Sequence, residues 1–319
     1  MPNFSKIVDR IDDAIATFIE RIPSSERAML YAVDDELRKL DLKDGKIKAT
    51  VGNLKTVSNI KNRLLQVILT DEYKGSVKEF LRSFNDITTL QNEFWRGVEK
   101  EFKPSSILKE IKKQAISDTA NKLLEAGIDV NVAQPVKDIL TTNITTGGSY
   151  EDLADQLREA LTTTDSDGLL GKHAKQIAID STNQYSRNYT QVVSSDLGYE
   201  WFAYQNTLIK TSRAFCIAMH ERRYFHISEI PNLLKAKDLY YTDPKTQEKR
   251  KVPLNEKTGL PNGMYSTTTV SNFTTLLGGY NCGHQLGPVS ERLVKMQDPV
   301  LFQKITNSPE YKNWQRAKK

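Results

Sequence analysis

The sequence has few of the features that mark secreted, membrane-spanning or secretory-targeted proteins. Its 319 residues include only two cysteines, which is too few for the disulfide framework of a small secreted domain. The apolar runs, such as 67–69, are far shorter than the roughly 20 residues that cross a bilayer. The N-terminal stretch 1–13 is rich in acidic residues and has no apolar signal core. We therefore expect a protein that is made and used in a cytoplasm and has no membrane partner.

The chain also has little net charge. It carries 45 lysines and arginines against 40 aspartates and glutamates, a formal net charge of +5. Such a balance permits a polyanionic partner without requiring one, whereas a dedicated DNA reader concentrates more positive charge on one face. Hydrophobic residues make up 38% of the chain, which excludes an intrinsically disordered protein. The length predicts two domains.

Motifs of the common enzyme classes are missing from the sequence. The glycine pairs at 147–148 and 278–279 lack the flanking pattern of a phosphate-binding loop, and no G-x-S-x-G elbow occurs. The paired carboxylates at 12–13 and 34–35 fall on polar helix faces, where solvated charge is the ordinary interpretation. The basic run 249–251 is either a solvated loop or a contact with DNA or an acidic partner. We therefore expect no enzyme activity.

Apolar residues recur at three- and four-residue spacing through the first hundred residues, which predicts a series of amphipathic helices. Pro23 ends the first helix, and the serines at 24–25 can cap the next. Pro104, followed by two more serines, ends the series and begins another. The first domain boundary is placed there, which gives a helical N-terminal domain over 1–103.

Helices continue after this boundary. Gly127 is placed as the C-terminal stop of a helix that begins near residue 107. Ser149 is a suitable cap for a helix over 151–161, whose first turn is acidic and therefore suits the positive end of the helix dipole. A longer helix over 169–195 ends before Gly198.

Beyond residue 198 the pattern changes. The aromatic stretch 199–204 predicts a strand, and 240–257 predicts a charged hairpin or long loop. The expected fold is mainly α, with a helical N-terminal domain and a smaller α+β C-terminal domain that holds a short antiparallel sheet. The second domain spans 104–292, and a basic C-terminal tail spans 293–319.

Both cysteines and most of the histidines lie in this last third, in two motifs. Cys216 and His220 are four residues apart, so in a helix they share a face. Cys282 and His284 are two apart, so in an extended segment they also share a face. Brought together, the four residues form a tetrahedral set of two sulfurs and two nitrogens, which suits a structural zinc ion.

Two alternatives to zinc stay open for these motifs. The cysteines and histidines can be buried and hydrogen-bonded without a metal. A Cys216–Cys282 disulfide is the third interpretation, and closing a loop of that length stabilises by roughly 4 kcal/mol in the chain-entropy model. A reducing cytosol opposes the disulfide.

The same motifs carry a resemblance to a known family. The segment 211–216, followed by 224–225 and 228–230, resembles the first signature of the phage Mu F-like minor head protein family. The segment 278–284, followed by 288–290, resembles the closing signature, and the helix containing 177–183 is similar to the one that precedes both in family members. The resemblance covers roughly 107–290. Many members have arginine where this chain has Gly283.

The resemblance implies a minor head (capsid) protein of a tailed bacteriophage, which acts in procapsid and head morphogenesis at the portal vertex and is packaged inside the virion. The implied partners are the portal protein, then scaffold or major capsid protein, and packaged DNA. The family has no established catalytic residues. The N-terminal helices, which lie outside the resemblance, are candidates for docking on the portal, or they pack only on themselves.

A metal-dependent nuclease or toxin-like effector carried in the phage head is the alternative function, and a plain DNA-binding protein is another. A nuclease needs a general base and metal-binding polar groups besides any structural ligands. If the four Cys and His residues are structural, only His226 and Asn281 remain nearby.

Overall fold

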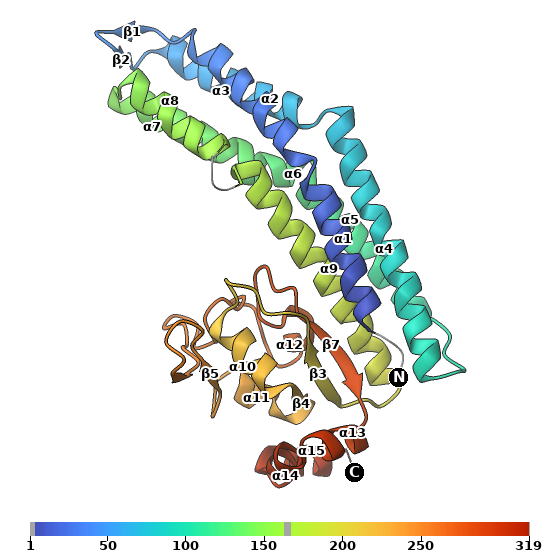
Figure 1. Ribbon diagram of the computed structural model, residues 1–319. Coiled ribbons are helices and arrows are strands. Elements are labelled where there is room, and N and C mark those ends of the chain that lie inside the picture. Colours follow the sequence, from blue (N-terminus) through green and yellow to red (C-terminus); the bar gives the residue numbers. More distant parts are fainter. Residues whose placement is uncertain (1–3, 163–166, 319) are drawn as a thin grey trace. The chain divides into compact units, whose positions relative to one another are not determined.

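The computed structural model describes residues 4–162 and 167–318, and these form a mainly helical protein with short antiparallel β-sheets (Figure 1). The helices of the first half are α1 (Ser5–Ile19), α2 (Ile22–Leu37), α3 (Val51–Ile68), α4 (Asp71–Val98), α5 (Ser106–Leu123), α6 (Glu125–Ile128), the π-helical turn Asp129–Ala133 and α7 (Gln134–Thr146). The helices that follow are α8 (Tyr150–Leu161), α9 (Leu169–Asp196), α10 (Ala214–Arg222), α11 (Ile230–Leu233), α12 (Phe273–Leu276), α13 (Glu291–Gln297), α14 (Pro299–Thr306) and α15 (Pro309–Ala317). None of the helices within the described ranges is long and apolar enough to cross a membrane. The predicted mainly α fold with a short antiparallel sheet in its C-terminal part is confirmed.

The strands are short and form three antiparallel sheets. They are β1 (Leu42–Lys43), β2 (Lys46–Ile47), β3 (Trp201–Gln205), β4 (Tyr224–His226), β5 (Tyr240–Thr242), β6 (Lys249–Lys251) and β7 (Gln285–Val289). The largest sheet has the order β4-β3-β7, and Phe202 in its centre lies opposite Phe225 and Pro288. A proline cannot donate to the ladder, so its place on the edge strand β7 is the expected one. The predicted strand near 199–204 and the predicted hairpin, now β5 and β6, are both confirmed.

The described residues divide into two compact units, which are not the predicted domains. Unit 1 comprises residues up to Asp9, 87–112 and from Ile179 onward, and unit 2 comprises 10–86 and 113–178. The boundary predicted at Pro104 therefore does not separate them. Pro104 does mark the start of a new helix, but α1, α4, α5 and α9 each contribute residues to both units. Signals for helix ends do not show which long helices share a core.

Unit 2 is built of helices packed along one another, α2 on α3, α3 on α7 and α7 on α8 (Figure 1). Phe18 stacks on Phe80 with ring centroids 4.8 Å apart. Glu26 is buried, and its carboxylate accepts a hydrogen bond of 2.8 Å from the backbone N–H of Gly171. The predicted cap of α8 is present, because the Ser149 hydroxyl accepts from the backbone N–H of Asp152 at 3.0 Å.

The helix predicted to stop at Gly127 ends earlier, at Leu123, and Gly127 itself lies within the next helical segment. The chain stays helical through α6 and the π-helical turn into α7, and Ile128, Val132 and Val136 are fully buried along it. A Cβ atom at Gly127 would lie 1.8 Å from the carbonyl oxygen of Lys122. The glycine is therefore needed for a close backbone approach within a helical segment, and the buried apolar residues beyond it hold the segment helical.

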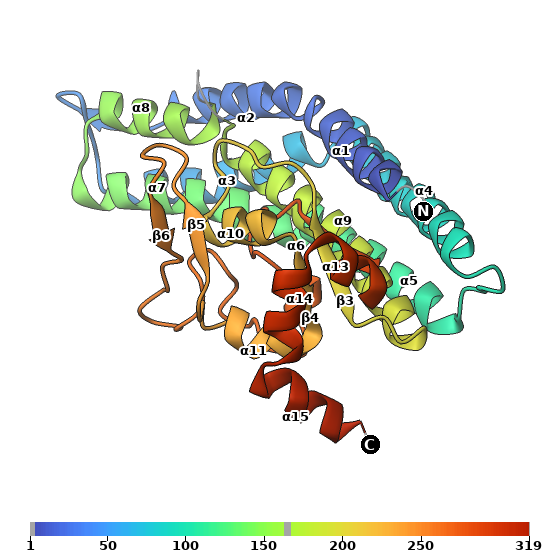
Figure 2. The same cartoon turned by 60° about the horizontal axis from the view of Figure 1, so that its bottom comes forward.

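The predicted basic tail, 293–319, is folded over its described residues. It forms α13, α14 and α15, drawn in dark red in Figure 2, and α13 begins at Glu291, before the predicted boundary. Val294 and Ile305 are buried, and Phe302 stacks on Trp201 with centroids 5.5 Å apart. These apolar side chains stabilise the segment on unit 1, although its overall composition is basic.

Candidate metal centre

The central strand β3 presents different side chains to the two faces of its sheet. Phe202 and Tyr204 belong to a buried cluster that includes residues of α10, whereas Trp201 and Ala203 pack with residues of α13 and α14. This alternation follows from the two-residue period of a strand. It places the Tyr204 side chain on the face where both Cys/His motifs meet.

Three of the four predicted ligands converge on this face. Cys216 comes from α10, and Cys282 and His284 come from the segment that leads into β7. One potential ligand atom of each lies within 4.8 Å of the others, and all three residues are buried. The Cys282 Sγ atom is 3.8 Å from the His284 Nδ1 atom. Two segments more than sixty residues apart in the sequence therefore meet at one cluster of two sulfurs and one imidazole, called the Cys/His cluster below.

His220 does not belong to this cluster. It lies in the last turn of α10 and is exposed, whereas 215–219 are buried. Four residues advance a helix by about 400°, so positions four apart differ in direction by about 40°. On a short helix whose core-facing side ends at Met219, that rotation is sufficient to direct His220 outward. The predicted four-residue set is thus reduced to three.

Tyr204 is the neighbour of the cluster that sequence reasoning missed. Its hydroxyl is 3.9 Å from Cys282 Sγ, and its ring lies over that of His284 with centroids 4.8 Å apart. The Nε2 atom of His284 is buried and has no hydrogen-bond partner among the described residues. The aromatic strand was visible in the sequence, but strand alternation alone could not show which of its side chains would meet the cysteines.

Gly278 leaves space for the sulfur atoms of Cys216 and Cys282. A Cβ atom on this residue would lie 2.7 Å from Cys216 Sγ and 2.9 Å from Cys282 Sγ, closer than such atoms approach in folded proteins. The glycine of the closing motif is therefore required by the position of the sulfurs rather than by a phosphate.

Arg187 fixes the backbone of the closing motif, 278–284, through hydrogen bonds. It is fully buried on α9, and its guanidinium donates to the backbone carbonyls of Thr275 at 2.7 Å, Cys282 at 2.9 Å and His284 at 2.8 Å. Nearby, the Asp180 carboxylate accepts from the backbone N–H of Asn281 at 2.6 Å. Both side chains lie on the helix predicted over 169–195, and nothing in the sequence of that helix marked them as buried.

The two thiols have different proton affinities. The Cys216 thiol donates to the Cys282 sulfur, and this hydrogen bond together with burial raises the pKa of Cys216. The same bond, with further donation from His284 and the nearby Arg187 charge, lowers the pKa of Cys282. Both residues are present as thiols rather than as a disulfide. The cluster thus offers two soft sulfur donors and one imidazole nitrogen, the donor types that zinc takes.

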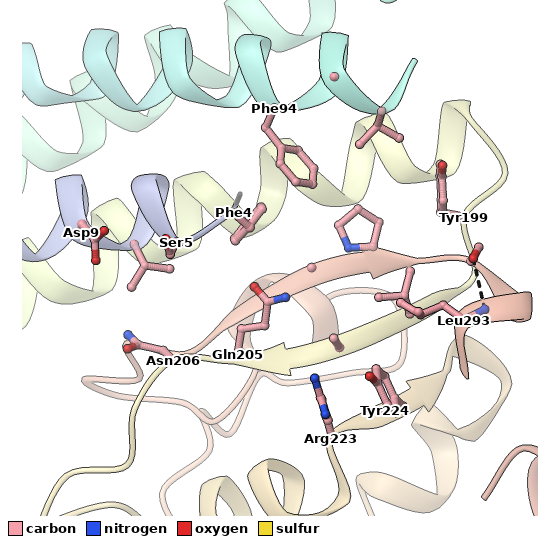
Figure 3. A pocket seen from close by; sticks show the side chains of 18 of the residues that line it. Phe4, Ser5, Asp9, Phe94, Tyr199, Gln205, Asn206, Arg223, Tyr224 and Leu293 are labelled. Carbon is pink, nitrogen blue, oxygen red and sulfur yellow. Dashed lines mark hydrogen bonds between the residues drawn. The ribbon is translucent and has the colours of Figure 1, made fainter. Parts of the chain in front are cut away.

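A groove of about 800 Å³ lies on the opposite side of the sheet (Figure 3). Phe4 and Phe94 line it from one side, and Gln205, Arg223 and Tyr224 line it from the other. It is separated from the Cys/His cluster by β3 and β7 themselves. The groove and the cluster are therefore two distinct features of unit 1.

His226, the histidine that remained as a candidate for the alternative nuclease function, is surrounded by aromatic rings. Its ring centroid is 5.0 Å from that of Trp201, 4.8 Å from Tyr311 and 4.9 Å from Trp314. Burial lowers the pKa of His226 to about 4. Its Nδ1 atom accepts from the backbone N–H of Ser228 at 3.1 Å. The histidine therefore caps the short helical turn Ile227–Glu229 rather than facing solvent.

No family model, curated protein or solved structure matches this chain.

Proposed function

We propose that this chain is a minor head protein of a tailed bacteriophage, which acts in head morphogenesis at the portal vertex. The observation that carries the proposal is the junction of the two segments that resemble the Mu F-like signatures. They contribute residues to α10, β4 and β7. Several of their side chains lie in one buried cluster with Phe202 and Tyr204 of β3, namely Phe215, Cys216, Phe225, Ile230 and Cys282. The resemblance thus involves a contiguous structural core rather than scattered short matches.

Binding, not chemistry, is the mechanism proposed. The Cys/His cluster is enclosed by the protein, and His226 is buried among aromatic rings. A nuclease needs a base and metal groups that reach a phosphodiester. The proposed partners are the portal protein, scaffold or major capsid protein, and packaged DNA. In the hairpin, Arg250 already pairs with Asp243 and Glu248, which reduces the charge available to DNA.

The purified protein is expected to leave supercoiled plasmid intact in the presence of Mg²⁺, Mn²⁺ or Zn²⁺. The reason is that the His226 side chain is buried among aromatic rings, so it cannot take a proton from a water molecule near DNA. Agarose electrophoresis measures nicking, with the His226→Asn variant alongside. Metal-dependent nicking that this variant loses would favour the nuclease function over the assembly function.

The protein is expected to co-purify with its cognate portal, and the N-terminal helices are expected to contribute. Tyr31 on α2 and Val51 on α3 are 69% and 72% exposed, more than a packed helix face requires. An unpaired charge buried in an interface costs at least about 2 kcal/mol. Tyr31→Glu or Val51→Glu should therefore weaken binding to the portal at least about thirtyfold.

Val300→Glu is the matched control, because Val300 is 78% exposed on α14, near the other end of the chain. It should retain wild-type binding. If wild-type protein does not co-purify at low salt, the assembly function is wrong. If Val300→Glu alone weakens binding, only the N-terminal docking face is wrong.

A further inference from the structure

The Cys/His cluster has the composition and spacing of a metal site with three protein ligands. In a tetrahedral zinc site, Zn–S bonds of about 2.3 Å and Zn–N bonds of about 2.0 Å place neighbouring ligand atoms about 3.5–3.8 Å apart. The Cys282 Sγ to His284 Nδ1 distance of 3.8 Å already meets this, and every pair is within 4.8 Å. The largest contraction that an ion would require is therefore about 1 Å.

The surroundings of the cluster also fit an ion. The side chains come from a helix on one side and from the segment before β7 on the other, and Arg187 fixes the carbonyls of Cys282 and His284. Gly278 leaves space at both sulfurs. The Tyr204 hydroxyl beside Cys282 can donate to a metal-bound thiolate.

We propose that Cys216, Cys282 and His284 bind one Zn²⁺ ion that joins the two motifs of unit 1, and that the Tyr204 hydroxyl supports this site by donating to a ligand sulfur. The ion replaces the thiol hydrogen bond between the cysteines and releases their protons on binding. With three protein donors, a bound water would complete the tetrahedron, and the burial of all three ligands gives the ion a structural role. The zinc proposal is independent of the assembly function, since it rests on the geometry of the cluster alone.

The test uses the full chain, purified under reducing conditions without chelator. Elemental analysis is expected to find one zinc per chain. After removal of the metal, titration with Co²⁺ is expected to give the intense visible absorption of tetrahedral cobalt with thiolate charge transfer, and Zn²⁺ should displace it at one equivalent. Failure of the wild-type protein to bind either ion, or a Cys216–Cys282 disulfide formed under these conditions, would overturn the proposal.

Variants identify the ligands. Cys282→Ser is expected to weaken Zn²⁺ affinity by more than about 100-fold, because losing an outer hydrogen-bond partner alone costs about 10- to 100-fold. Gly278→Ala should also lose the metal, since its Cβ would displace both sulfurs. His220→Ala is the matched control, an exposed histidine of the same motif, and should bind with wild-type affinity. Equal loss in His220→Ala would overturn the three-residue set.

Tyr204→Phe separates the role of the hydroxyl from that of the ligands. It should keep one metal per chain and lower the affinity by about tenfold. Unchanged affinity would overturn the part assigned to Tyr204. Should a ligand variant fail to fold, the wild-type stoichiometry and the Co²⁺ spectrum decide the proposal without it.

Discussion

Replacement of Arg187 by methionine is expected to lower the free energy of unfolding of unit 1 by about 3–5 kcal/mol, because each buried group left without its hydrogen-bond partner costs about 1–3 kcal/mol. Arg187 is 1% exposed and donates to three backbone carbonyls. Methionine fills most of the volume but leaves those carbonyls buried without a donor. It also removes the positive charge near Asp180, whose pKa is already raised by burial.

Tryptophan fluorescence is a suitable measurement, because all three tryptophans, Trp95, Trp201 and Trp314, lie in unit 1. Denaturant unfolding should show a lower midpoint for Arg187→Met. Arg187→Lys should recover part of the loss, since it keeps the charge but not the planar fork of donors. The control is Lys237→Met, which breaks an exposed ion pair with a glutamate of the same unit and should cost less than about 1 kcal/mol. Equal effects at Arg187 and Lys237 would mean that Arg187 has no special role.

Most of the helices and the cap at Ser149 could be predicted because they depend on short-range patterns. Apolar spacing, the serine before α8 and the aromatic strand β3 act within a few residues. The wrong predictions concern packing between distant segments. Gly127 was indicated as a stop, yet the glycine serves a close approach of backbones, a reason that depends on tertiary structure.

The candidate site also combines residues that local sequence patterns predicted with residues whose position depends on tertiary structure. Ligand types and spacing indicated Cys216, Cys282 and His284, since thiols and imidazoles in pairs are rare. His220 has an equally suitable spacing but is exposed, because the direction of a side chain at a helix end depends on where the helix leaves the core. Arg187 could not be found from the sequence at all. A charged residue on a helix ordinarily faces water, and nothing local indicates the three carbonyls that bury it.

Acidification is expected to destabilise unit 1 through His226. The histidine is fully buried, and burial lowers its pKa to about 4, against 6.5 for an ordinary histidine. Between these values the unfolded chain binds a proton that the folded protein does not. Stability is therefore complete above about pH 6.5 and falls as the pH decreases toward 4, by at most about 3 kcal/mol for a difference of this size.

Other charged groups around His226 contribute with different signs. Glu200 Oε2 lies 3.6 Å from its Nε2 atom and would favour the protonated ring, but Glu200 also pairs with Lys318. Glu229, which follows on the next turn, has a pKa raised by burial. A raised carboxyl pKa stabilises the folded state as the pH falls, opposite to the effect of His226. A single pH profile of the wild-type protein would therefore mix these contributions.

The comparison of wild type with His226→Asn isolates the histidine. Asparagine offers a carbonyl oxygen near the place of Nδ1, so it can still accept from the Ser228 backbone N–H and cap the turn. It does not titrate, whereas Glu200, Glu229 and Lys318 are common to both proteins. The difference in unfolding free energy between the two proteins, followed by tryptophan fluorescence from pH 7 to pH 4, should change by about 2–3 kcal/mol in favour of the variant. A difference that stays constant across this range would mean that Glu200 stabilises the protonated ring fully and that the aromatic enclosure does not exclude its charge.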